Sequence, residues 1–250
     1  FAGPSRPTDT PGEEDYRDLF DGKTLNGWVT SGGRYDGDAA WSVEDGQIVG
    51  RTKDGQGGLL YTDRPYTEFV MQLEVRTDWP FDSGIFLRMA PRGKGAQVTL
   101  DTRDDGEIGA IYADGFLRHN ESGVKLWKKD YWNRIEVRCT GERMRIAVQL
   151  NDEALVDYEV PPDMEGFAPT GLIGLHVHGD RADPAGNAVR FRRLRIRELS
   201  RTVTEMIRRD DAGIAEVTPW GLANGWTNLL ADPRLAAAAA HIAPTPITSP

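Results

Sequence analysis

The feature of this sequence that most limits its fold is the alternation of apolar and polar residues in short runs. In Phe69–Arg76 every second residue from Phe69 is apolar, and Val70, Gln72, Glu74 and Arg76 stand on the opposite face. Similar runs, separated by Gly, Asp and Asn turns, lie at Ser83–Met89, Ala96–Asp101, Trp132–Thr140, Arg143–Leu150 and Val189–Leu199. No helical period appears before Ser200. The pattern predicts an all-β chain folded as an antiparallel sandwich or barrel.

The composition changes at both ends of this alternating region. Residues 1–15 are rich in Pro, Gly, Thr and acid, which predicts a flexible linker. Residues 16–199 are expected to form the sandwich. Residues 200–250 are expected to form a partly helical extension, because Asp232-Pro233 is a good helix start. Two tryptophans in this extension favour packing against the domain or a neighbouring subunit, so a homo-oligomer is one prediction.

The bulk composition excludes several classes of protein. A formal charge of −9 argues against a nucleic-acid-binding surface, which needs a basic patch. The single cysteine, Cys139, excludes an internal disulfide framework and a cysteine zinc cluster, and its alternating neighbours predict burial. No run approaches the ~20 apolar residues that a membrane-spanning helix requires.

Two of the four histidines lie two positions apart in one predicted strand, Gly171–Gly179. Successive side chains of a strand point to opposite faces, so His176 and His178 share one face, about 6–7 Å apart. Ile173, Leu175 and Val177 share the other. The spacing alone fits a solvated strand face as well as a functional site.

The polar faces of the predicted strands together carry carboxylates, imidazoles, a guanidinium and an amide. The residues of this set are Glu74, Arg88, Gln97, Asp101, His176 and His178. If one concave sheet gathers them into a groove, they suit a sugar, whose hydroxyl pairs match planar polar groups. Aromatic residues to stack on the sugar ring are available at Trp79, Tyr112 and Trp127.

Several motifs resemble one known family in order and spacing. They include Leu19-Phe20-Asp21-Gly22-Lys23, Trp41–Gly50, Ser83–Arg88, Gly109–Tyr112 and Gly174–Gly179. Over Tyr16–Leu199 the chain resembles the 3-keto-disaccharide hydrolase family. The resemblance implies a concanavalin A-like jelly-roll sandwich, export to the periplasm or the cell exterior, and action on glycosides oxidised to a ketone at C3.

The resemblance also implies a reaction. A ketone at C3 makes the C2 proton acidic, so a base removes it, the C1 substituent leaves by β-elimination, and water adds to the enone. The resemblance aligns His178, Glu74 and Arg88 with catalytic positions, with His178 as base and Arg88 or a divalent metal stabilising the enolate. Gln97, Asp101, His176, Tyr112 and Trp127 are then predicted to bind substrate. His176 stands where many family members have glutamine.

The sequence leaves open whether the protein needs a cofactor and to which functional class it belongs. No cofactor is required by the reaction, but His176 and His178 with Glu74 form one candidate set of ligands for a divalent metal. The main alternative function is a lectin-like carbohydrate-binding module without catalysis, since fold does not fix function. A third is a two-carboxylate glycosidase in which Glu74 pairs with Asp101.

Overall fold

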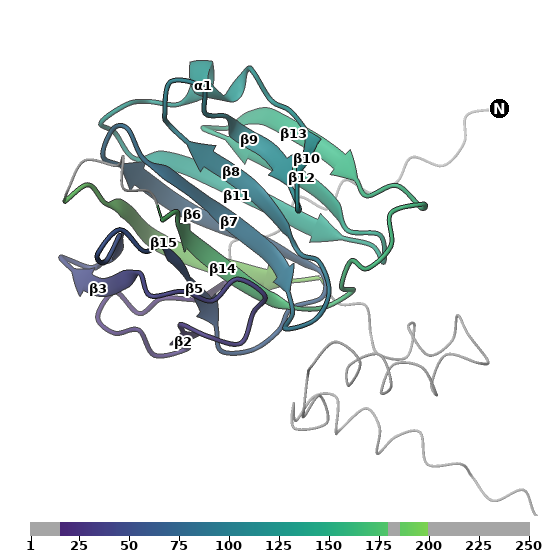
Figure 1. Ribbon diagram of the computed structural model, residues 1–250, viewed down its shortest axis with the longest axis horizontal. Helices are drawn as coiled ribbons and strands as arrows, with labels where there is room; N and C mark the ends of the chain where they lie inside the picture. Colours follow the sequence, from purple (N-terminus) through teal and green to yellow (C-terminus); the bar gives the residue numbers. More distant parts are fainter. Residues whose placement is uncertain (1–15, 180–185, 200–250) are drawn as a thin grey trace, which may run out of the picture.

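The computed structural model describes residues 16–179 and 186–199, which form two antiparallel sheets packed face to face (Figure 1). In order across the sheet, sheet A comprises β13 (Glu153–Glu159), β12 (Arg145–Leu150), β11 (Asn133–Thr140), β6 (Phe69–Thr77), β15 (Val189–Glu198), β4 (Gln47–Arg51) and β3 (Ala40–Glu44), with β1 (Arg17–Asp18) beside β15. Sheet B comprises β10 (Phe116–Arg118), β9 (Ile108–Tyr112), β8 (Ala96–Asp101), β7 (Asp82–Met89), β14 (Leu172–Val177), β5 (Gly58–Thr62) and β2 (Trp28–Val29). The described residues also form one short helix, α1 (Gly123–Leu126).

This architecture confirms the predicted all-β jelly-roll sandwich. The predicted linker, residues 1–15, and the predicted extension, residues 200–250, lie outside the described residues. No helix within 16–179 or 186–199 is long and apolar enough to cross a membrane.

The core lies between the two sheets and is built by the alternation seen in the sequence. Met71 and Leu73 of β6 face Ile85 and Leu175 of sheet B, and each is at most 1% exposed. Burying an aliphatic side chain of this kind contributes about 1.5–3 kcal/mol. Cys139 is fully buried in the same core, as the sequence predicted.

A second, smaller apolar cluster lies on the outer face of sheet B. Its members are Leu59, Tyr61, Phe86, Met89 and Leu172. The segment of residues 30–38, here called the strap, packs on this cluster: Tyr35 contacts Phe86 with 6.0 Å between ring centroids. A Cβ on Gly33 would lie 2.2 Å from the Tyr61 ring, so the strap backbone needs glycine there.

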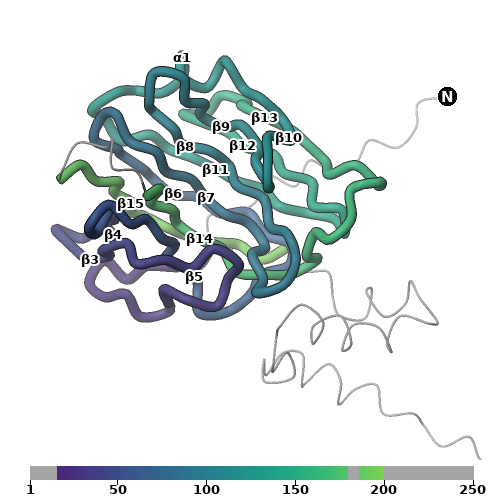
Figure 2. Tube along the Cα trace, viewed as in Figure 1, coloured from purple at the N-terminus to yellow at the C-terminus, as the bar shows by residue number. Residues whose placement is uncertain are grey.

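The strap also reaches the far end of sheet B. The Tyr35 hydroxyl donates to the carboxylate of Asp114 in the β9–β10 turn, and Arg34 pairs with the same carboxylate at 3.0 Å. Figure 2 shows why this is a long reach: β3, β4 and β5 gather at one end of the sandwich, and β9 and β10 lie at the other. The strap therefore borders the outer face of sheet B along one side.

Candidate functional site

Strand β14 places the two histidines on the outer face of sheet B. Ile173, Leu175 and Val177 point into the core and are unexposed, whereas His176 and His178 point away from it. Their ring centroids are 5.8 Å apart and the rings are nearly perpendicular. The prediction that His176 and His178 share one face is therefore confirmed.

His178 lies against an aspartate that begins the neighbouring strand. Its Nδ1 is 3.7 Å from Oδ2 of Asp82, and its backbone N–H donates to the Asp82 carbonyl at 3.2 Å. The Asp82 side chain is 12% exposed and that of His178 is 45% exposed. The backbone bond thus fixes His178 beside a nearly buried carboxylate, to which Nδ1 makes no hydrogen bond in this structure. The imidazole remains open to solvent, which suits a group that exchanges protons with a ligand.

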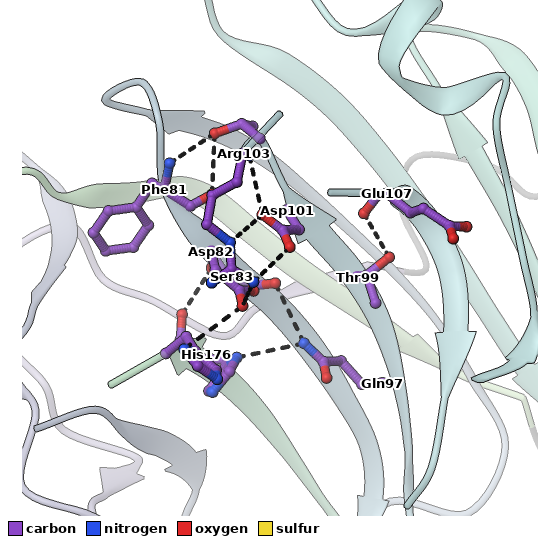
Figure 3. A network of polar contacts seen from close by, with 11 residues as sticks. Phe81, Asp82, Ser83, Gln97, Thr99, Asp101, Arg103, Glu107 and His176 are labelled. Atoms are coloured by element: carbon purple, nitrogen blue, oxygen red, sulfur yellow. Dashed lines mark hydrogen bonds and ion pairs between the residues drawn. The ribbon is translucent and has the colours of Figure 1, made fainter. Parts of the chain in front are cut away.

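Arg103 joins two carboxylates beside this pair (Figure 3). Its guanidinium donates to Asp82 at 2.6 Å and to both oxygens of Asp101, at 2.8 and 2.9 Å. Asp82 and Asp101 are directly opposite in the β7–β8 ladder, so the sheet itself brings them together. Charge-assisted bonds of this kind hold the guanidinium in one orientation.

His176 occupies a drier position than His178. Its Nδ1 lies 3.4 Å from Nε2 of Gln97, and its ring meets the edge of Phe86 at 5.3 Å. Burial above all, then electrostatic interaction with His178 and Arg103, lowers the pKa of His176 to about 3. His176 is therefore neutral near pH 7 and acts there as a hydrogen-bonding group.

This shifted pKa makes stability depend on pH. Between pH 6.5 and 3 the unfolded chain binds a proton at His176 that the folded chain does not, so stability falls as pH falls through this window. At pH 5 the loss from this residue is about 2 kcal/mol. Urea unfolding of His176→Gln measures this effect. Between pH 7.5 and 5 we expect the free energy of unfolding of the variant to fall by about 2 kcal/mol less than that of the unaltered protein. Equal losses in the two proteins would contradict the assignment.

Three other predicted substrate-binding residues are also on sheet B. Gln97 and Tyr112 are directly opposite in the β8–β9 ladder. Asp101 lies at the end of β8 with Arg103. The structure thus brings together His176, His178, Gln97, Asp101 and Tyr112.

The prediction that Glu74 belongs to this group is wrong. Glu74 lies on the outer face of β6, in the opposite sheet, where its oxygens accept from Arg192 at 2.6 Å and from Arg193 at 2.9 Å. The two outer faces of a sandwich point away from each other. The metal set of His176, His178 and Glu74 is therefore also wrong, as is the glycosidase pair of Glu74 and Asp101. No three His, Cys, Asp or Glu side chains within 16–179 and 186–199 converge to hold a metal.

The prediction that Arg88 lies in the site is wrong for a different reason. The β7–β14 register shifts between Phe86 and Met89, so alternation is interrupted there, and Arg88 has φ of 50°. Its side chain is unexposed and points between the sheets, donating to the carbonyls of Thr67 and Gly141 at 2.7 and 2.8 Å. Met89 consequently joins the outer apolar cluster in its place.

Trp127, predicted to stack on sugar, is 7% exposed and part of the main core. Sequence reasoning also missed two residues of the site. Asp82 directly precedes the predicted strand Ser83–Met89, and Arg103 follows the predicted strand Ala96–Asp101 by two positions. Extending each predicted strand by one or two residues was the available signal, because Asp82 and Arg103 then fall on the polar face.

Comparison with known proteins agrees with this picture of the fold. Residues 15–197 match the model of the 3-keto-alpha-glucoside-1,2-lyase-like domain. The chain is 35% identical over 86 residues to a 3-keto-disaccharide hydrolase of Bacteroides thetaiotaomicron, a stretch that covers 32% of this chain and 28% of that protein.

Two solved structures are similar in fold. One is a putative glycosyl hydrolase from Parabacteroides distasonis, at a TM-score of 0.55 and 21% identity, covering 75% of this chain and 95% of that one. The other is a galectin-like protein of unknown function from Bacillus subtilis, at a TM-score of 0.51 and 9% identity, covering 71% and 92%. Because the family match spans most of the chain, the protein belongs to the family of 3-keto-alpha-glucoside-1,2-lyase-like domains.

Proposed function

We propose that this protein cleaves glycosides that carry a ketone at C3, binding them on the outer face of sheet B. The observation that carries the proposal is the His178–Asp82 pair beside the Arg103 guanidinium, in a chain whose family takes its name from this chemistry. An exposed imidazole, an oriented cation and an amide within one patch are the groups that proton abstraction next to a ketone requires.

In the proposed reaction the imidazole of His178 removes the proton on C2. The electrons of the C2–H bond form an enolate with C3. The Arg103 guanidinium stabilises the enolate oxygen, which is the role that the sequence suggested for Arg88. As the ketone re-forms, C1 and C2 become doubly bonded and the C1–O1 bond breaks. O1 takes a proton from the imidazolium, which restores neutral His178, and water then adds its hydroxyl to C1 and its proton to C2.

The remaining residues hold the substrate in this scheme. Neutral His176 and Gln97 offer hydrogen bonds to sugar hydroxyls, and Asp82 orients His178. Arg103 supplies the positive charge that the enolate needs, so no metal is required in the proposal. Activity that persists after dialysis against EDTA is expected, and loss that Mn²⁺ or Ca²⁺ restores would contradict this part.

The test of the function is release of the leaving group from a matched pair of substrates. We expect the protein to release 4-nitrophenol from a 4-nitrophenyl 3-keto-glucoside and not from the unoxidised glucoside, because only the ketone acidifies C2. Cleavage of both would indicate an ordinary glycosidase. Saturable binding of the keto-glycoside without turnover would support the lectin-like module instead.

Two further properties stay predictions. Export to the periplasm or the cell exterior is expected from the family resemblance, and fractionation of the native host with an antibody to the protein measures it. Self-association through residues 200–250 is checked by analytical ultracentrifugation of the full chain.

A further inference from the structure

The groups that face the His176 ring show which of its two nitrogens carries the proton. Nε2 of Gln97 lies 3.3 Å from the Ser83 carbonyl. A carbonyl can only accept a hydrogen bond, so the amide turns its nitrogen, and not its oxygen, to this side. The same amide nitrogen lies 3.4 Å from Nδ1 of His176 (Figure 3). Nδ1 therefore faces an N–H donor and is the acceptor of the pair.

This contact determines what the other edge of the ring offers. A neutral imidazole has one N–H, and its second nitrogen is an acceptor. Because Nδ1 accepts from Gln97, the proton of His176 is on Nε2. Within residues 16–179 and 186–199 Nε2 has no hydrogen-bond partner, and it is not a buried atom. His176 thus presents an N–H donor to a ligand.

Gly84 leaves the space that the Gln97 amide occupies. It lies directly opposite His176 in the β7–β14 ladder. A Cβ on Gly84 would lie 2.2 Å from the amide nitrogen of Gln97 and would push the amide aside. The close approach of a neighbouring side chain therefore explains the glycine at this position in the strand.

Two more contacts hold the His176 ring in place. The Phe86 ring meets it edge-on, with 5.3 Å between centroids, and the Ser83 hydroxyl donates to the His176 carbonyl at 2.7 Å. Burial lowers the pKa of His176 to about 3 and keeps the ring neutral near pH 7. A donor that is fixed in advance needs no reorganisation during a reaction, which is what stabilisation of a transition state requires.

The separation of the two histidines suits one step of the proposed reaction. Their ring centroids are 5.8 Å apart. In a bound 3-keto-sugar, the C2 proton and the ketone oxygen belong to adjacent carbons. A base about 3–3.5 Å from C2 and a donor about 2.8 Å from the ketone oxygen are then roughly 5–8 Å apart. The pair can therefore reach the C2 proton and the ketone oxygen of one sugar together.

Among the oxygens of the sugar, the ketone oxygen gains most from the Nε2–H of His176. It can only accept a hydrogen bond, and it becomes negative as the enolate forms, so this bond strengthens in the transition state. A neutral imidazole can polarise a carbonyl in this way. A protonated His176 would instead repel the positive charge that His178 acquires when it takes the C2 proton.

We propose that His176 is a catalytic residue whose Nε2–H donates to the ketone oxygen of the substrate and so shares the enolate charge with Arg103. Gln97 is its positioning residue, because it holds the proton on Nε2. His176 keeps this proton throughout, and His178 alone takes the proton from C2. The inference rests on the proposed function, because it assigns a further role in the same reaction.

Removing the donor tests the role of His176. We expect His176→Leu to lower kcat for methyl 3-keto-glucoside about 10²–10³-fold with little change in KM, as when one donor is removed from an oxyanion site. His176→Gln keeps an N–H donor and is expected to lose less than about 10-fold. The matched control is His119→Leu, which removes a histidine with a 66% exposed side chain and is expected to leave kcat unaffected. Equal losses in His176→Leu and His176→Gln would overturn the donor role.

The position of the ring proton can be changed without replacing His176. In protein with isotopically labelled histidine, nitrogen NMR at pH 7 is expected to show an unprotonated Nδ1 and a protonated Nε2 for this residue. Gly84→Ala and Gln97→Leu are both expected to move part of the proton to Nδ1 and to lower kcat. A proton on Nδ1 in the unaltered protein, or the same tautomer in both variants, would overturn the positioning role of Gln97.

An infrared measurement separates this inference from the function on which it rests. His178→Gln is expected to bind a keto-sugar without turnover. The C=O stretch of the bound sugar is expected at lower frequency in His178→Gln than in the double variant with His176→Leu, because only the former has the donor. Equal frequencies would overturn the inference, while turnover by the unaltered protein would keep the function. If the unaltered protein turns over no 3-keto-glucoside, the function fails, and the same two frequencies still decide whether His176 binds the ketone.

Discussion

Replacing His178 by glutamine is expected to lower kcat/KM for a 3-keto-glucoside by about 10²–10⁴-fold, the range typical for loss of a general base. Glutamine keeps the size and one hydrogen-bonding edge of the imidazole but does not take up a proton. Because His178 is half exposed and donates its backbone N–H, not its side chain, to the Asp82 carbonyl, the fold is expected to survive. Initial rates of leaving-group release measure the effect.

A second measurement distinguishes loss of the base from loss of binding. In D₂O the unaltered protein is expected to exchange the C2 proton of a bound keto-sugar, whereas His178→Gln is expected to bind the sugar without exchange. Asp82→Asn removes the carboxylate that lies 3.7 Å from the imidazole. We expect its kcat to fall less than that of His178→Gln, and its KM to stay nearly unchanged. Full C2 exchange in His178→Gln would assign the base to another residue.

The fold was predictable because alternation along each strand records which side faces the core. Met71, Leu73 and Ile85 occupy the interior as their spacing predicted. Alternation does not record which sheet a strand joins, and this is why Glu74 was grouped with the histidines. Its strand alternates in the same way as β7 and β8, but pairs with β11 and β15. Only the long-range pairing of the strands decides on which of the two outer faces a polar residue such as Glu74 lies.

Arg88 shows a second limit of sequence reasoning. A single irregularity in β7 reverses the faces of the residues that follow it, so one register shift moved an arginine inward and Met89 outward. Bulges of this kind leave no clear local signature when the positive-φ residue is not glycine. Among the predicted site residues, His178, Gln97 and Tyr112 do lie on the outer face of sheet B, on β8 and β9 or directly after β14, as alternation places them.

Arg88→Met is expected to lower the free energy of unfolding by about 2–4 kcal/mol. The arginine belongs to sheet B, but its Nε and Nη1 donate to carbonyls of Thr67 and Gly141, which flank strands of sheet A, so the side chain ties the sheets together at one end. Methionine fills much of the volume but leaves two buried acceptors without these donors, at about 1–3 kcal/mol each. Part of this cost is offset because the variant no longer buries a charged guanidinium away from water.

The matched control is Glu74→Gln, the other residue that the sequence placed wrongly in the catalytic group. Its ion pairs with Arg192 and Arg193 lie on the outer face of sheet A, so we expect a loss under about 1 kcal/mol. Urea unfolding at a constant m-value measures both variants. Folded Arg88→Met, isolated at low temperature, is expected to retain kcat, because Arg103 and not Arg88 stands beside His178. An Arg88→Met protein with unaltered stability and no activity would return Arg88 to the active site and remove Arg103 from the mechanism.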